Sequence, residues 1–267
     1  MLFGTKAETL ERLAPLIRSA SVLPQERFTI ETWRRDEAGV LARVSARGWF
    51  DKPVIVRSST LAEDAAGASR AGQFLSVGDV RGKDALRAAV SRVIASYGER
   101  DVHNQLFVQP MLGNVALSGV AFSIDPNNAG PYFVVNYDDS SGSTSTVTSG
   151  ETNQVRTLYF CKHSPGKVPE NLAGVIDLVR ELEKLLGSNA IDVEFARTAE
   201  GELFLLQVRP LATAVELSAE GGSHRIALEQ IHARLRAMMR PHPYLHGTRS
   251  VFGVMPDWNP AEIVGVR

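Results

Sequence analysis

The chain has 267 residues, of which 44% are hydrophobic and 22% charged, which is the composition of a globular protein. The net charge of -1 excludes a broad electrostatic attraction to nucleic acid or to an anionic membrane. The single cysteine, Cys161, excludes a disulfide within the chain and a cysteine-based zinc site, and it favours a cytoplasmic location. No apolar run reaches the ~18 residues of a membrane span, and the N-terminus lacks the apolar core of a signal peptide.

Residues 1–105 mix helices and strands and are expected to form a smaller, N-terminal lobe. Thr5 followed by Glu8 is a capping-box pattern that predicts the start of a helix, which Pro15 is expected to kink or end. The apolar segment KPVIVRSS predicts a strand that enters a loop rich in alanine, glycine and serine. The segment KDALRAAVSRVIASYG then predicts a helix, because its apolar residues recur along one face.

Residues 106–215 are expected to form a larger and mainly antiparallel lobe, because predicted strands follow one another closely. The segments LFVQPML, LSGVAFSID and YFVVNY are the first three of these strands. Another strand, a helix that ends at Gly187 and a hairpin follow. Residues 216–267 contain a linker, an arginine-rich helix and an irregular tail, and they are expected to lead to a further domain. The predicted fold class is therefore α/β (α+β).

The hairpin IDVEFARTAEGELFLLQVRP, residues 191–210, carries polar residues at every second position of otherwise apolar strands. A two-residue turn formed by residues 200–201, with glycine supplying the positive φ, pairs Asp192 with Arg209 and Glu194 with Gln207. All four polar side chains then lie on one face of the sheet, as the period of two requires. A three-residue turn is expected to pair polar residues of one strand with apolar residues of the other and so to mix them on both faces.

The polar face predicted for this hairpin suits a metal ion and phosphate. Mg²⁺ prefers one or two carboxylates together with substrate phosphates, which Asp192 and Glu194 on one rigid strand offer. Arg209 beside them suits the oxygens of a phosphate. The alternative is a structural ion pair between Asp192 and Arg209 on an exposed face, and the hairpin alone leaves both interpretations open.

Three other features are candidates for contact with phosphate. Lys6 lies at the predicted start of a helix, Arg57 lies near the end of an apolar strand, and residues 140–150 form a loop of small hydroxyl residues and glycine. The alternative interpretations of these three features are an exposed lysine, a surface arginine and a flexible loop. Neither GxxxxGK[ST] nor GxGxxG occurs, which excludes the P-loop and the dinucleotide-binding fingerprint.

Four segments in order along residues 3–211 resemble the ATP-binding domain shared by phosphoenolpyruvate synthase, pyruvate phosphate dikinase and rifampicin phosphotransferase. VIVRSSTLAEDAAGASRAGQF is similar to the most specific motif of that family, Val-Arg-Ser-Ser followed by Glu-Asp and Ser-x-Ala-Gly-Gln. The other three matching segments are FGTKAETLERL, VQPML with SGVAFSIDP, and DVEFA with LLQVRP.

The resemblance implies an ATP-grasp fold, with two lobes that contain mixed and antiparallel sheets and hold ATP and Mg²⁺. Asp192 and Glu194 are then expected to bind Mg²⁺. Residues 109–111, with Gln109 and Met111, are expected to border the adenine. The residues expected to contact or support the phosphates are Lys6, Arg57, Gln207 and Arg209, of which Lys6, Arg57 and Arg209 are also the expected catalytic residues.

The implied activity is that of an ATP-dependent phosphotransferase of the dikinase type. Such an enzyme moves the β-phosphoryl group of ATP to a histidine on a separate domain and releases AMP and phosphate. The acceptor motif Thr-x-Ser-His is absent from the sequence, and SSGSTSTVTSG replaces a Gly-Leu-Gly-Glu loop typical of the family. The expected partners are therefore ATP and a histidine domain outside this sequence. The alternative is a non-catalytic nucleotide-binding or regulatory module.

Overall fold

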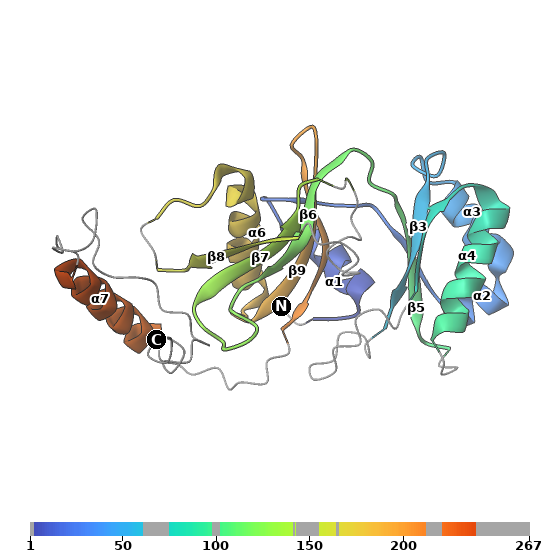
Figure 1. Ribbon diagram of the computed structural model, residues 1–267. Coiled ribbons are helices and arrows are strands. Elements are labelled where there is room, and N and C mark those ends of the chain that lie inside the picture. Colours follow the sequence, from blue (N-terminus) through green and yellow to red (C-terminus); the bar gives the residue numbers. More distant parts are fainter. Residues whose placement is uncertain are drawn as a thin grey trace, which may run out of the picture. The chain divides into compact units, whose positions relative to one another are not determined.

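The computed structural model divides the chain into two compact units, Met1–Leu217 and Ser218–Arg267 (Figure 1). The residues described are 3–60, 75–97, 102–140, 142, 155–163, 166–211 and 221–238. In the second unit they form helix α7 (Gly221–Met238). Over these described ranges, no helix combines the length and the apolar character needed to cross a membrane.

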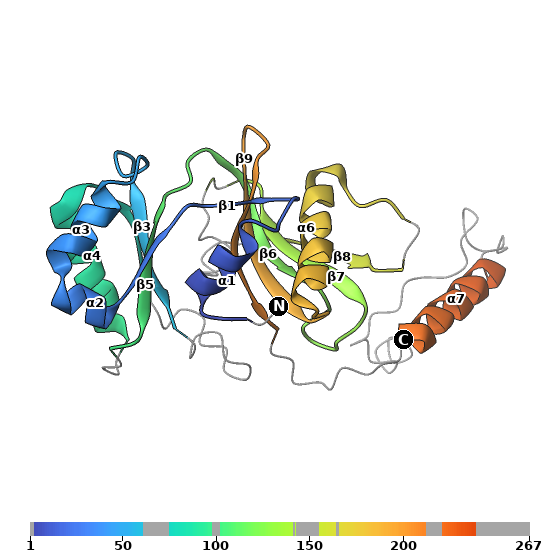
Figure 2. The same cartoon turned by 180° about the vertical axis from the view of Figure 1, so that it is seen from behind.

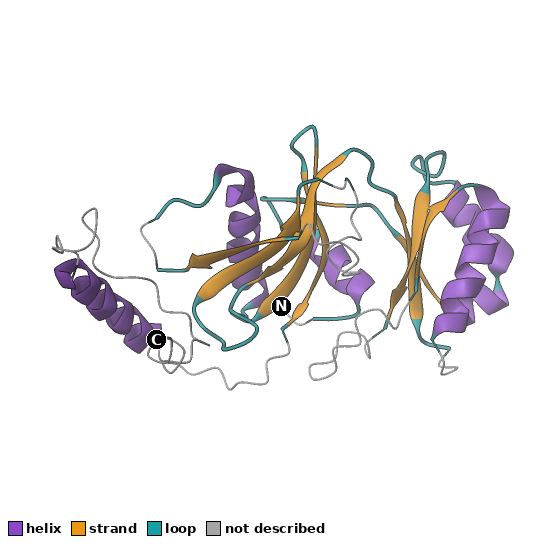
Figure 3. Ribbon diagram, viewed as in Figure 1, coloured by secondary structure: helices purple, strands orange, loops and turns teal. Residues whose placement is uncertain are grey.

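The smaller sheet has four antiparallel strands in the order β2-β5-β3-β4. They are β2 (Glu26–Thr29), β5 (Gln105–Pro110), β3 (Val54–Ser59) and β4 (Ser76–Val80). Helices α2 (Ile30–Arg35), α3 (Glu37–Ser45) and α4 (Gly82–Ser96) cover one face (Figure 3). Alternate residues of β3 explain the two faces, because Val54 and Val56 join the helical core whereas Arg57 and Ser59 point to the other side.

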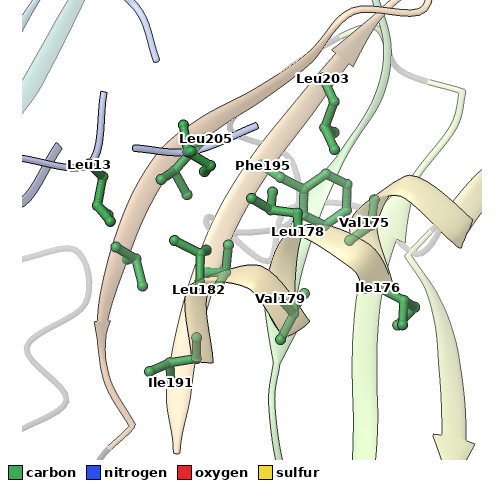
Figure 4. Packing of buried hydrophobic residues seen from close by; sticks show 14 of the residues in the cluster. Leu13, Val175, Ile176, Leu178, Val179, Leu182, Ile191, Phe195, Leu203 and Leu205 are labelled. Carbon is green, nitrogen blue, oxygen red and sulfur yellow. The ribbon is translucent and has the colours of Figure 1, made fainter. Parts of the chain in front are cut away.

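The larger sheet has six strands in the order β1-β10-β9-β6-β7-β8. They are β1 (Ser21–Val22), β10 (Leu203–Pro210), β9 (Ile191–Thr198), β6 (Val115–Phe122), β7 (Tyr132–Asp138) and β8 (Arg156–Cys161). The sheet is mixed, because β1 is parallel to β10 and every other pairing is antiparallel. Helices α6 (Glu170–Leu186) and α1 (Lys6–Leu13) contribute to the core that includes the apolar side chains of β9 (Figure 4).

The two sheets share segments of the chain. Helix α1 and strand β1 come from the N-terminal part of the chain but belong to the core or the edge of the larger sheet. Phe107 lies on β5 of the smaller sheet and is fully buried in the core of the larger one. The architecture confirms the predicted α/β class with one mixed and one antiparallel sheet. The division at residues 1–105, 106–215 and 216–267 stays a prediction.

The turn of the β9–β10 hairpin differs from the predicted two-residue turn. The amide of Gly201 donates to the carbonyl oxygen of Thr198 (3.0 Å), and the amide of Thr198 donates to that of Glu202 (3.0 Å). Gly201 has a φ of 92°, as expected for the left-handed residue of a three-residue loop. The prediction of a two-residue turn was therefore wrong.

A β-bulge at Leu206 restores the predicted pairing despite this longer turn. Leu205 pairs with Phe195, but after the register shift Gln207 pairs with Glu194 and Arg209 with Asp192. The extra residue compensates for the odd number of residues in the turn. The predicted pairing of the four polar residues is thus confirmed, although two irregularities produce it rather than none.

Gly119 on β6 allows a test of the close packing between β6, β7 and β9. A Cβ atom at this position would lie 2.2 Å from the carbonyl oxygen of Asn136 and 3.0 Å from Cζ of Phe195. We expect Gly119→Ala to lower the free energy of unfolding by about 1–3 kcal/mol, because the backbone of β7 must move. Urea denaturation measures this change.

Gly174, inside helix α6, provides the matched control. A Cβ atom there would meet only Cδ2 of Leu203, at an ordinary contact distance of 3.8 Å. Gly174→Ala is expected to raise the free energy of unfolding by about 0.5–1 kcal/mol, because alanine favours the helix. Equal effects of the two substitutions would contradict the packing described for Gly119.

Candidate functional site

The polar residues of β9 lie on the face of the larger sheet opposite its main core. Ile191, Val193 and Phe195 are fully buried in that core. Asp192 and Glu194 alternate with them and therefore point to the other face. The predicted alternation therefore corresponds to a strand with an apolar face in the core and a polar face on the other side of the sheet.

Asp192 and Arg209 form a partly buried ion pair. Nε of Arg209 donates to Oδ2 of Asp192 at 2.8 Å, and the two side chains are 26% and 7% exposed, respectively. The pair is therefore not the exposed surface ion pair of the alternative interpretation. Burial raises the pKa of Asp192; the charges of Arg209 and Lys6 oppose this effect, whereas that of Glu194 adds to it.

Arg57 connects the smaller sheet to the polar face of the larger one. Its Nη2 lies 3.4 Å from Oε2 of Glu194, and its Nη1 donates to the carbonyl oxygen of Leu206 at 3.3 Å. Its guanidinium carbon lies 5.8 Å from the centre of the Phe107 ring. Its Nε is buried and has no hydrogen-bond acceptor among the described residues. A buried donor without an acceptor is costly, so this guanidinium suits an additional anionic ligand.

Lys6 is buried at the first position of helix α1, which contradicts the interpretation of an exposed lysine. The capping box predicted for Thr5 and Glu8 is confirmed. The amide of Glu8 donates to Thr5 Oγ1, and the amide of Ala7 donates to Oγ of Ser59. Because these first-turn amides already have acceptors, the side chain of Lys6 is better placed to attract an anion than the backbone of the helix.

The other predicted residues lie around this group. Gln207 is buried and pairs with Glu194 across the hairpin. Gln109 is also buried, and it shares with Arg57 the face of the smaller sheet that its helices leave uncovered. Met111 is 45% exposed, and its Sδ lies 3.3 Å from the amide nitrogen of Asp79. Among the described residues, Gln109 and Met111 form hydrogen bonds with Leu23 and Asp79, respectively, and not with the charged group.

Two polar groups near the site were not predicted from the sequence. One is the carbonyl oxygen of Leu206, which accepts from Arg57 where the bulge interrupts the regular ladder. The other is the hydroxyl of Ser59, which accepts from helix α1. The consecutive leucines in LFLLQVRP interrupt the apolar–polar alternation and could have indicated the bulge. Most of the predicted loop 140–150 and the family-like segment 61–74 lie outside the described residues.

The charged group fits Mg²⁺ and an anion. Lys6, Arg57 and Arg209 supply three positive charges, and Asp192 and Glu194 supply up to two negative charges, which leaves an excess of at least one positive charge. The two carboxylates are hard oxygen donors of the kind Mg²⁺ binds together with phosphate oxygens. Within the described ranges, no group of three or more His, Cys, Asp or Glu residues forms a metal site made by protein side chains alone.

Comparison with known families identifies the same domain that the sequence resembles. Residues 34–154 match the family described as pyruvate phosphate dikinase, AMP/ATP-binding domain. This match confirms the resemblance over strands β3, β4 and β5 of the smaller sheet and strands β6 and β7 of the larger one. No curated protein matches the chain.

Solved structures with similar folds include three from bacteria. They are the VanG D-Ala:D-Ser ligase from Enterococcus faecalis, D-alanine-D-alanine ligase from Helicobacter pylori and an ATP-grasp RimK domain protein from Sphaerobacter thermophilus. Their sequence identities to this chain are 16%, 14% and 16%, and the TM-scores are 0.44, 0.45 and 0.43.

The extent of these structural matches is partial. The alignments cover 79%, 85% and 83% of this chain, but only 54%, 57% and 62% of the three solved chains. This chain thus spans less than two thirds of their length. The family match and the architecture of one mixed and one antiparallel sheet agree with the fold class expected from the resemblance.

The buried carboxyl group of Asp192 leads to a prediction about pH. Burial raises its pKa in the folded protein above the ordinary 3.8, so the folded state holds this proton more tightly than the unfolded state. The contribution of Asp192 to the free energy of unfolding therefore decreases as the pH rises from 3.8 through the folded-state pKa. We expect Asp192→Asn to remove this decrease.

Urea denaturation of the wild type and of Asp192→Asn over a series of pH values tests this expectation. The other titrating groups contribute in both proteins, so the difference between the two curves isolates Asp192. As the pH rises from 3.8, the free energy of unfolding of the wild type should fall relative to that of Asp192→Asn. A difference that stays constant over the acidic range would contradict a raised pKa.

Proposed function

Because residues 34–154 match the AMP/ATP-binding domain of pyruvate phosphate dikinase, we propose that the chain binds ATP with Mg²⁺ at the charged group described above. The observation that carries this proposal is the meeting of charged side chains from α1, β3, β9 and β10 at one partly buried position. Burying so many charges is costly unless each has a partner. A Mg-triphosphate provides both the cation and the anionic oxygens that such a group can bind.

In this proposal Lys6, Arg57 and Arg209 bind phosphate oxygens and stabilise the charge that develops during transfer. Arg57 offers a buried Nε without an acceptor among the described residues, and a phosphate oxygen would supply one. Asp192 and Glu194 hold Mg²⁺, which neutralises phosphate charge when bound. Gln207, beside Glu194, supports the polyphosphate.

An apolar cluster beside the charged group is a candidate binding place for the adenine base of ATP. It consists of Val115, Ala196, Phe204 and Leu206, with Leu23 and Leu112 packed against it. Ala196 follows Asp192 and Glu194 on the same face of β9. Apolar side chains beside phosphate-binding groups suit a nucleotide base. We propose that this cluster and residues 109–111, which carry Gln109 and Met111, border the adenine.

The reaction that we propose is phosphoryl transfer of the dikinase type. A histidine nitrogen on a separate domain accepts the β-phosphoryl group, the bond from that phosphorus to the bridging oxygen of AMP breaks, and one water is consumed as the γ-phosphate is released. The support is the family match together with the residues available for charge stabilisation. The proposed location is the cytoplasm, and the acceptor domain lies outside this sequence.

Binding of Mg-ATP tests the residue assignments. We expect Glu194→Ala and Arg209→Ala each to weaken binding by about 10–100-fold in isothermal titration calorimetry, because each removes a charged ligand. Glu194→Ala should also reduce the dependence of binding on Mg²⁺.

Arg197→Ala is the matched control for these variants. Arg197 lies on the same hairpin, and its guanidinium donates to the carbonyl oxygen of Asn171 on helix α6. We expect binding of Mg-ATP to remain within about twofold of the wild type, because this contact lies on the helical side of the sheet. Unchanged binding in both Glu194→Ala and Arg209→Ala would contradict the proposed site.

Product analysis with a cognate histidine domain tests the type of reaction. AMP and phosphate in equal amounts, with phosphorylated histidine, are the products expected of a dikinase. ADP as the nucleotide product would indicate an ordinary kinase instead. Tight binding of ATP without any turnover would favour the alternative, a non-catalytic nucleotide-binding or regulatory module.

A further inference from the structure

Ser59 joins the two segments that carry Lys6 and Arg57. It lies two residues after Arg57 on β3, so both side chains point to the same face of the smaller sheet. Ser59 is fully buried, and its Oγ accepts a hydrogen bond from the amide of Ala7 at 2.9 Å. Ala7 directly follows Lys6 on helix α1. One buried hydrogen bond therefore connects the strand of Arg57 to the first turn of the helix of Lys6.

Strand β5 also forms hydrogen bonds with the first turn of helix α1, through Gln105. The amide of Ser59 donates to the hydroxyl of Tyr97 at 3.2 Å, and that hydroxyl donates to the backbone carbonyl of Gln105. The side chain of Gln105 accepts from Thr5 Oγ1 at 3.1 Å and donates to Oε1 of Glu8 at 2.8 Å. Both members of the capping box are thus bound to the smaller sheet, although Leu10 and Leu13 of the same helix pack in the larger core.

Helix α1 consequently lies between the two sheets in both views of the molecule (Figures 1 and 2). A lysine side chain has many rotamers, and its reach to a ligand depends on where its backbone is fixed. The bond from Ala7 to Ser59 fixes the backbone beside Lys6 relative to the strand of Arg57. It therefore joins the two backbone segments from which these cationic side chains extend.

We propose that Ser59 is a positioning residue that sets the spacing of Lys6 and Arg57 for the phosphates of ATP. This inference rests on the proposed function, because it assumes that both side chains bind one polyphosphate. Ser59 itself acts through helix α1 rather than on the ligand. If the bond only stabilised the fold, removing it would not affect ATP binding through Lys6.

Ser59→Val and Ser59→Thr test this role, because valine and threonine have the same shape and differ in the hydroxyl group. Both variants place the same extra volume at a buried position, so the packing cost cancels in the comparison. We expect Ser59→Val to bind Mg-ATP roughly tenfold more weakly than Ser59→Thr in calorimetry. In the background of Lys6→Met, the two variants should differ less than about twofold.

Ser58 supplies the matched control. It is almost fully buried next to Ser59, but alternation along β3 turns its side chain toward the helical core of the smaller sheet. The ratio of Mg-ATP affinities between Ser58→Thr and Ser58→Val should be the same with and without Lys6→Met. Hydrogen exchange provides a second measurement without ligand. The amide of Ala7 should exchange faster in Ser59→Val than in Ser59→Thr.

The outcomes separate this inference from the proposed function. If the wild type does not bind Mg-ATP, the proposed function fails, and the positioning role fails with it. If the wild type binds but Ser59→Val and Ser59→Thr bind equally well, only the positioning role is overturned. A difference between the two variants that persists unchanged in the Lys6→Met background would also overturn it, because the effect would then not pass through Lys6.

Discussion

The organisation of this protein depends on the cost of burying charge between two sheets. Asp192 is almost fully buried on a strand whose other face forms the main core, and a buried carboxylate is stable only beside opposite charge. Arg209 comes from the adjacent strand, whereas Arg57 reaches Glu194 from the other sheet. The polar face therefore needs both sheets, and the same charges that join them are suited to bind a ligand.

The hairpin shows how two local irregularities can together preserve the pairing of polar residues. Three residues in the turn would by themselves shift the polar residues of β10 relative to those of β9. The bulge at Leu206 reverses that shift, so Gln207 and Arg209 face Glu194 and Asp192. It also leaves the Leu206 carbonyl available to Arg57. One added residue thus aligns the polar face and supplies a contact between the sheets.

Helix α1 links the stability of the fold to the geometry of the site. Its apolar side contributes Leu10 and Leu13 to the larger core, while its first turn is bound by Ser59 and Gln105 of the smaller sheet. Burial raises the pKa of Asp192, and the charge of Lys6, which lies at that turn, opposes this rise. A movement of one sheet relative to the other would therefore alter the surroundings of Lys6 and Arg57 together.

The sequence by itself determined the α/β class, the capping box of α1 and the polar pairs of the hairpin. These features follow from local sequence patterns, although the three-residue turn and the bulge that produce the polar pairs were not predicted. Only the tertiary structure decided that Lys6 and Arg57 meet Asp192 and Glu194, and that α1 packs against the larger sheet. Such contacts join segments far apart along the chain, and no local pattern specifies which buried charges will become neighbours.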